Sequence, residues 1–149
     1  ADAIHQLKYA SRPHVAAALA SLAQPHLAQA LLWADALVPI PLHRERLQER
    51  GYDQAFLLAQ ALARPRGLPV LEDVLVRARA TRTQVGQGVQ ERAENLAGAF
   101  QLEGPGALGG RRLLLVDDVI TTSATMRAGA GVLRDVGAQV AIAAIARAF

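Results

Sequence analysis

Apolar residues along the chain fall into separate blocks whose spacing differs from block to block. Between residues 13 and 32 they recur at intervals of three and four, which predicts a helix with Pro13 in its first turn. The segment QAFLLAQALA at 54–63 follows Asp53, a residue that favours helix N-caps, and also has apolar residues on one helical face. We therefore expect two amphipathic helices in the first half of the chain.

Three other blocks are apolar without polar alternation, a pattern typical of strands buried on both faces. They are DALVPIP at 35–41, RRLLLVDD at 111–118 and AQVAIAAIARA at 138–148. Between the last two, residues 124–136 have a helical pattern that ends at Gly137. A strand, helix and strand in this order imply parallel pairing, so the expected fold class is α/β, with a central, mainly parallel sheet flanked by helices.

The composition indicates one compact domain over residues 1–149. Hydrophobic residues make up 52% of the 149 positions, enough to bury one sizeable core. The chain has no cysteine, which excludes disulfides and cysteine-based zinc sites, and no two of its four histidines have the close spacing of a helical metal pair. No apolar run approaches the length of a membrane span. We therefore expect a soluble protein without a membrane span, located in the cytoplasm.

The charge distribution changes this picture locally. The formal net charge is +3, which permits contact with polyphosphate or nucleic acid but is also ordinary for a solvated surface. Residues 76–90 contain Arg77, Arg79 and Arg82 and no acidic residue. Aromatic residues make up only 4% of the chain, which argues against a surface on which single-stranded bases stack.

The segment LLLVDDVITTSAT at 113–125 carries the clearest chemical signal. We expect its strand to end at Asp117 and Asp118, because ligands of parallel sheets bind at the carboxyl ends of the strands. Small residues before a helix that begins near Ser123 would aim backbone amides and hydroxyls at a phosphate. The carboxylates suit vicinal hydroxyls, and a phosphate beside a diol describes a ribose 5-phosphate.

Two other interpretations of this segment compete with phosphate binding. The carboxylates and hydroxyls could simply cap the loop and the helix, but two adjacent carboxylates at the end of a buried strand would repel each other without a binding role. The string LLLVDD also occurs in response-regulator receivers. In receivers the acidic pair lies near the start of the domain, and a phospho-acceptor aspartate and a lysine follow it. Here the chain after Asp118 contains a single further aspartate, Asp135, and no lysine, so that interpretation fails.

Residues 113–125 resemble the phosphoribosyl pyrophosphate (PRPP) motif of type I phosphoribosyltransferases. Three further blocks resemble the ComF family, the competence-associated phosphoribosyltransferase-like proteins: IHQLKYASR at 4–12, VPIPLHRERLQERGYDQAFLLAQALA at 38–63 and TRTQVGQGVQERAENLAGAF at 81–100. The usual amino-terminal cysteine cluster of that family is missing, so we expect a truncated form or a shorter member. Ser123 stands where the PRPP motif usually has glycine.

The resemblance implies a type I phosphoribosyltransferase-like fold, with residues 1–33 as a helical hood and residues 34–149 as the core. It implies that Asp117 and Asp118 bind the ribose and, with Arg82, serve catalysis. The residues implied to bind the 5'-phosphate of PRPP are Thr121, Thr122, Ser123, Ala124 and Thr125. Those implied to bind its pyrophosphate are Pro39, Ile40, Pro41, Leu42, His43, Arg44, Arg77 and Arg79. For the charged residues near Arg44, a solvated, ion-paired helix is an equally good interpretation.

The implied reaction is transfer of ribose 5-phosphate from PRPP to an unidentified nitrogen acceptor, with residues 77–90 as a closing lid over the site. Mg²⁺ would be held through PRPP and water, with no direct coordination by the protein. Two alternatives stay open. The chain could be a weakly active or inactive PRPP- or nucleotide-binding partner of a helicase-type protein in DNA uptake, or it could bind single-stranded DNA through residues 77–92. A homodimer also stays open.

Overall fold

The computed structural model describes residues 13–42, 53–78, 98–104, 106–120 and 123–147, and its centre is a parallel sheet. The strands are β1 (Ala36–Pro39), β4 (Arg112–Ile120) and β5 (Gln139–Arg147), in the order β1-β4-β5. Because β4 lies between the other two, both of its edges are hydrogen-bonded. This arrangement confirms the predicted α/β class with a mainly parallel sheet.

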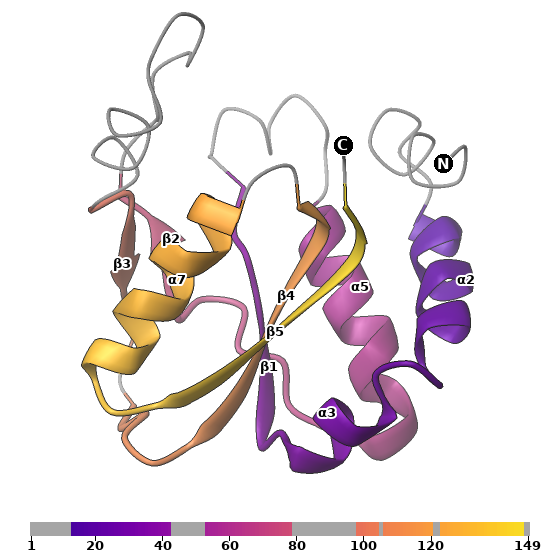
Figure 1. Ribbon diagram of the computed structural model, residues 1–149, viewed down its shortest axis with the longest axis horizontal. Helices are drawn as coiled ribbons and strands as arrows, with labels where there is room; N and C mark the ends of the chain where they lie inside the picture. Colours follow the sequence, from indigo (N-terminus) through magenta and orange to yellow (C-terminus); the bar gives the residue numbers. More distant parts are fainter. Residues whose placement is uncertain (1–12, 43–52, 79–97, 105, 121–122, 148–149) are drawn as a thin grey trace, which may run out of the picture.

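Helices α2 (Pro13–Ala23), α3 (Ala28–Trp33) and α5 (Gln54–Ala63) cover one face of the sheet (Figure 1). The helix α5 presents Leu58 and Leu62 to this face, where they pack with Leu114 and Val116 of β4. These four side chains are completely buried. The apolar periodicity of residues 54–63 therefore corresponds to the face with which α5 packs on the sheet. The short 3-10 helix η1 (Arg64–Arg66) follows α5 along the chain.

The other face is covered by α7 (Ser123–Asp135) and by a two-stranded antiparallel sheet of β2 (Leu75–Arg77) and β3 (Phe100–Leu102). The opposite set of β4 side chains, Leu113 and Leu115, packs here. The expected helix over 124–136 is thus confirmed to within one residue at each end. Gly137 ends it with φ of +90°, a left-handed conformation that glycine adopts without strain.

The register between β1 and β4 is fixed at their amino ends by Asp35 and Arg112. The carboxylate of Asp35 accepts from the backbone N–H of Arg112 at 2.8 Å and from its guanidinium at 3.1 Å. The N–H of Asp35 donates in turn to the carbonyl of Arg112 at 2.7 Å. These bonds hold the pKa of Asp35 below its ordinary value and align Ala36 with Leu113.

The prediction of one continuous helix over residues 13–32 is wrong. The helix α2 ends at Ala23, a turn covers residues 24–27, and α3 begins at Ala28. Pro25 in this turn has no backbone N–H, so it cannot continue the helical hydrogen-bond ladder. The Nε2 of Gln24 donates to the carbonyl of Leu62 at 2.9 Å, which fastens the turn to α5.

The prediction that the strand ends at Asp117 and Asp118 is also wrong. Pairing between β4 and β5 continues to Ile120, which lies opposite Arg147. The partner strand extends the ladder two residues beyond the acidic pair, so only residues 121–122 separate β4 from α7.

No helix in the described part of the chain is both long and apolar enough to cross a membrane.

Candidate functional site

The elements that carry the predicted site residues meet at one edge of the sheet. Figure 1 shows the carboxyl ends of β1, β4 and β5 at this edge, together with the amino-terminal ends of α5 and α7. The register places Pro39 opposite Val116, and the N–H of Ile40 donates to the carbonyl of Val116 at 2.9 Å. The segment 39–42 therefore lies directly beside Asp117.

Asp117 and Asp118 continue two different rows of side chains. Successive residues of a strand point to opposite faces, so Asp117 follows Leu115 towards the α7 side and Asp118 follows Val116 towards the α5 side. Asp117 is half-buried, whereas Asp118 is only 9% exposed. The Oδ1 of Asp117 accepts from the N–H of Asp118 at 2.8 Å. The two carboxylates thus flank the end of β4 from both sides.

The amino terminus of α7 provides a site suited to an anion. Its first residue, Ser123, is exposed, Ala124 and Thr125 are half-buried, and its first turn contains no acidic residue. The first N–H groups of a helix have no partner within the helix and carry the positive end of its dipole. Three of the five predicted phosphate-binding residues begin α7, while Thr121 and Thr122 lie outside the described residues. Their binding role stays a prediction.

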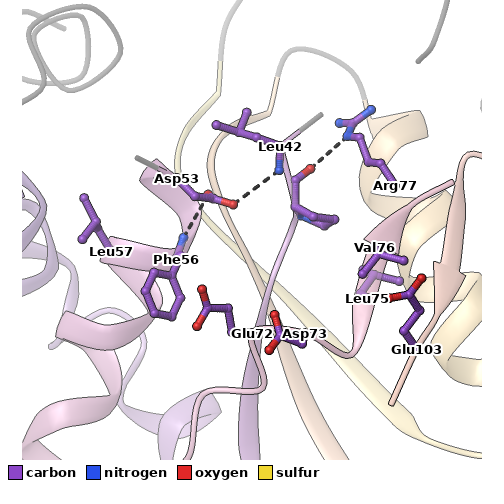
Figure 2. A pocket seen from close by; sticks show the side chains of 11 residues that line it. Leu42, Asp53, Phe56, Leu57, Glu72, Asp73, Leu75, Val76, Arg77 and Glu103 are labelled. Carbon is purple, nitrogen blue, oxygen red and sulfur yellow. Dashed lines mark hydrogen bonds between the residues drawn. The ribbon is translucent and has the colours of Figure 1, made fainter. Parts of the chain in front are cut away.

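The segment Pro39–Leu42, the described part of the predicted pyrophosphate loop, is held from two sides. The N–H of Leu42 donates to Oδ2 of Asp53 at 3.3 Å, and Nε of Arg77 donates to the carbonyl of Pro41 at 2.9 Å (Figure 2). Ile40 is buried in the core on the α7 side, so only its backbone can face a ligand. The other residues predicted to bind pyrophosphate, His43, Arg44 and Arg79, lie outside the described residues.

Arg77 supports this loop from β2. Its guanidinium carbon lies 5.0 Å from the centre of the Phe100 ring, a cation–π arrangement between β2 and β3. Together with the bond from Nε to Pro41, this contact fixes the side chain between the small sheet and the loop. A direct contact of Arg77 with pyrophosphate stays a prediction. So does the catalytic role of Arg82, which lies outside the described residues.

Asp53 is a residue of the site that the sequence predicted only as a helix start. Its Oδ1 accepts from the N–H of Phe56 at 3.1 Å and thereby caps α5, while Oδ2 holds Leu42. Burial raises the pKa of this carboxyl, and the nearby charge of Asp118 adds to the rise. The capping role could be deduced from the sequence, but the contact with Leu42 depends on how the two segments fold together.

A cavity of about 610 Å³ lies beneath the loop, between α5 and β2 (Figure 2). Phe56, Leu57 and Leu75 give it apolar walls, and Arg77 is the single cationic residue among the described residues that line it. Its acidic lining residues are Asp53, Glu72, Asp73 and Glu103. Among the described residues that line the cavity, carboxylates outnumber the cation, which disfavours a polyphosphate beside them. The start of α7, the candidate anion site, is not among the described residues that line this cavity.

Within the described residues, no group of three histidine, cysteine or acidic side chains is placed to hold a metal ion. Asp117 and Asp118 flank the strand instead of converging in a cage. Binding of Mg²⁺ through PRPP and water, as the resemblance implies, stays a prediction.

Comparison with known proteins agrees with this geometry. Residues 52–148 match the family model described as phosphoribosyl transferase domain. The most similar solved structures include a glutamine PRPP amidotransferase from Bacillus subtilis complexed with ADP and GMP. It has a TM-score of 0.61 at 22% sequence identity, and the match covers 95% of this chain and 30% of that chain. At this identity the likeness shows the fold alone.

Three relatives are closer in sequence. Competence protein F of Haemophilus influenzae is 40% identical over 70% of this chain and 46% of its own length. DNA utilization protein YhgH of Salmonella typhimurium is 38% identical over 83% of this chain and 56% of its own length. Competence protein ComFC of Bacillus subtilis is 34% identical over 68% and 39%, respectively. The chain thus spans about half the length of the first two relatives.

These matches confirm the resemblance identified from the sequence, including its fold. The absence of cysteine from all 149 residues is consistent with the missing cysteine cluster. The chain therefore belongs to the phosphoribosyl transferase domain family and, within it, to the ComF proteins.

Proposed function

We propose that the chain binds PRPP at the carboxyl edge of the sheet and transfers its ribose 5-phosphate to a nitrogen acceptor. The observation that carries this proposal is the short connection between β4 and α7. It sets a helix amino terminus, suited to a phosphate, two residues beyond a strand whose last four residues include two carboxylates. Family membership supports the same ligand.

Each end of PRPP has a candidate partner in this arrangement. The amides of Ser123 to Thr125 would bind the 5'-phosphate, and Asp117 and Asp118 would accept hydrogen bonds from the ribose hydroxyls. The backbone of residues 39–42 would face the pyrophosphate. Mg²⁺, bound to PRPP and water, would neutralise the leaving group. The bond from ribose C1 to pyrophosphate breaks while a bond from C1 to the acceptor nitrogen forms.

The protein's contribution to this reaction would be positioning. The positive charge that develops on the ribose ring lies near the carboxylates of β4, and fixed backbone donors hold the phosphate end at a constant distance from them. Loop 39–42 is held by Asp53 and Arg77, so its backbone needs little reorganisation when pyrophosphate binds. We also propose that the protein acts in the cytoplasm.

Calorimetry with PRPP and Mg²⁺ tests the binding step. Each of Asp117→Asn and Asp118→Asn should weaken binding by about 1–3 kcal/mol, because a charged hydrogen bond to the ribose is lost. Circular dichroism should show that both variants keep the fold. Wild-type affinity in both variants would refute the roles assigned to these carboxylates.

A second candidate is supported by the names of the relatives, which are competence and DNA utilization proteins. In that case the chain would bind PRPP or a nucleotide without turnover and serve a helicase-type partner in DNA uptake. Pyrophosphate release with a panel of purine and pyrimidine bases separates the two candidates: release with any base favours the enzyme. PRPP binding without release favours the binding protein.

Direct binding of single-stranded DNA is a third candidate and has its own test. Binding through Arg77 and its neighbouring arginines would release counterions, so the logarithm of affinity should fall steeply with the logarithm of salt concentration. A flat salt response would exclude this candidate. Aromatic residues make up only 4% of the chain, which leaves little surface for stacked bases, so we favour PRPP over DNA as the ligand of this edge.

A further inference from the structure

Gln54, the first residue of α5, is an unusual side chain. It is only 2% exposed, and its Nε2 has no hydrogen-bond partner in the described structure. Native proteins nearly always pair a buried amide donor, because an unpaired one loses its hydrogen bonds to water without replacement. A buried donor without a partner in the ligand-free protein is a candidate for pairing when a ligand binds.

The positions of Gln54 and Asp118 identify that partner. Gln54 lies one helical turn before Leu58, on the buried face of α5, and Asp118 lies two residues after Val116 on the same face of β4. Leu58 and Val116 belong to one apolar cluster. Gln54 therefore continues the row of buried side chains on α5 towards the carboxyl edge of the sheet, and Asp118 continues the facing row on β4. Among the described residues, these two are the polar or charged ones that are buried.

Of the two described carboxylates close to the start of α5, Asp118 is the one that accepts no hydrogen bond. Both oxygens of Asp53 accept from backbone N–H groups, those of Phe56 and Leu42. In the described part of the structure, no hydrogen bond reaches the carboxylate of Asp118. The charge of Asp118 is nevertheless felt at Asp53, the residue next to Gln54, so this carboxylate lies close to the start of α5.

We infer that Gln54 is a positioning residue for Asp118: when a ribose engages Asp118, Nε2 of Gln54 donates to the carboxylate and fixes its orientation. This inference rests on the proposed function, since it assigns the ribose to Asp118. Pairing of the buried amide would be gained only in the bound state. Gln54 should therefore strengthen ligand binding without stabilising the free protein.

The variant Gln54→Met tests this inference, because methionine has similar length and flexibility but no donor. The free variant should melt at the same temperature as wild type or higher, since an unpaired buried donor is removed. Its dissociation constant for PRPP with Mg²⁺, measured by calorimetry, should rise about tenfold. The matched control Gln60→Met changes an exposed glutamine of the same helix and should alter neither quantity.

A lower melting temperature for free Gln54→Met would overturn the inference, because it would show that the side-chain amide of Gln54 already stabilises the free protein. Unchanged PRPP affinity of a folded variant would also overturn it. A nuclear magnetic resonance measurement on wild type is independent of the variant's folding. A side-chain amide proton of Gln54 should move downfield when PRPP and Mg²⁺ are added, and an unmoved signal at saturation would contradict the pairing.

The same binding measurements separate a failure of the proposed function from a failure of the role assigned to Gln54. If wild type does not bind PRPP at all, the proposed function is refuted, and this inference falls with it. If wild type binds PRPP and both Asp118→Asn and Gln54→Met bind it equally well, the ligand lies away from Asp118. If Asp118→Asn alone weakens binding, only the positioning role of Gln54 is refuted.

Discussion

At the scale of single residues, Asp53 shows how one carboxylate joins local structure to the site. It caps α5 through Phe56 and holds the end of the β1 loop through Leu42. Both bonds favour the ionised form, yet burial outweighs them and raises the pKa of the group. The capped helix and the held loop therefore come at the cost of a desolvated charge next to Asp118.

The raised pKa gives a signed prediction for stability against pH. The stabilisation that Asp53 gives the folded protein is fully present below the pKa of this group in the unfolded chain, close to the ordinary value of 3.8. It is lost as pH rises through the higher pKa of the folded state. In the variant Asp53→Asn the new side chain cannot ionise but still offers a capping oxygen. In urea titrations, the unfolding free energy of this variant relative to wild type should thus increase from about pH 4 to neutrality.

The exposed residue Asp73 provides the matched control for this measurement. The variant Asp73→Asn also removes one carboxylate from the cavity wall, but this side chain stays in contact with water in the folded protein, so the burial effect expected of Asp53→Asn should be absent. A constant difference between Asp53→Asn and wild type at all pH values would contradict the role of burial at Asp53.

At the scale of elements, α7 lies close against the sheet at one position. A Cβ atom placed on Gly129 would lie 3.0 Å from Cδ1 of Ile40, 3.3 Å from Cδ2 of Leu75 and 3.5 Å from Cδ2 of Leu115. The glycine thus lets α7 approach these three side chains together. Ile40 precedes Pro41 in the loop, so the packing of α7 also sets the position of that loop.

The variant Gly129→Val should lower the unfolding free energy by about 1–3 kcal/mol, because the added methyl groups overpack this contact. Gly131 on the same helix has open space around its Cβ position. The variant Gly131→Ala should instead stabilise the protein by up to about 1 kcal/mol, through helix propensity alone. Chemical denaturation of both variants checks the prediction, and equal effects of the two would contradict the close approach.

Much of the element structure could be predicted from the sequence, and the failures have physical causes. Helix α5 was predicted with its observed bounds and α7 to within one residue, because Asp53 and Gly137 mark ends by local chemistry. The end of β4 depends on how far its partner β5 runs, which is a non-local property. The break at Pro25 was missed because the apolar periodicity continues through it.

The candidate site could be predicted less completely than the elements. The sequence located Asp117, Asp118 and the start of α7 near Ser123, since these lie close together along the chain. The strand's alternation, which sets the two carboxylates on opposite faces, follows only once β4 is known to continue past them. The bonds that Arg77 and Asp53 make to loop 39–42 join distant segments, so no local pattern could predict them.

At the scale of the whole molecule, two hydrophobic clusters lie on the two faces of one sheet, and the candidate site draws on both. The cluster with α2 and α5 contains Leu58 and Leu114, and the cluster with α7 contains Leu113 and Leu115. Asp118 continues the first row and Asp117 the second. A ribose held by both carboxylates would therefore connect the two halves of the core.

Hydrogen exchange tests this connection. PRPP at about 100 times its dissociation constant should stabilise the native state by about 2.7 kcal/mol, which raises the melting temperature by roughly 5–10 °C. Slower exchange should appear in α5 as well as in α7, because both helices begin at the ligand. Protection confined to α7 would contradict a ribose held from both faces, although it would agree with a phosphate bound there alone.

The two-residue passage from β4 to α7 also limits how this protein can change its chemistry over time. Because only two residues join this strand to this helix, the spacing between the proposed phosphate donors and the acids of β4 changes little when other parts of the chain change. New acceptors would have to be accommodated by changes elsewhere along the rim. Substitutions that alter the proposed acceptor should accordingly accumulate outside residues 112–135, while those at Asp117, Asp118 or Ser123 should weaken binding of the proposed ligand.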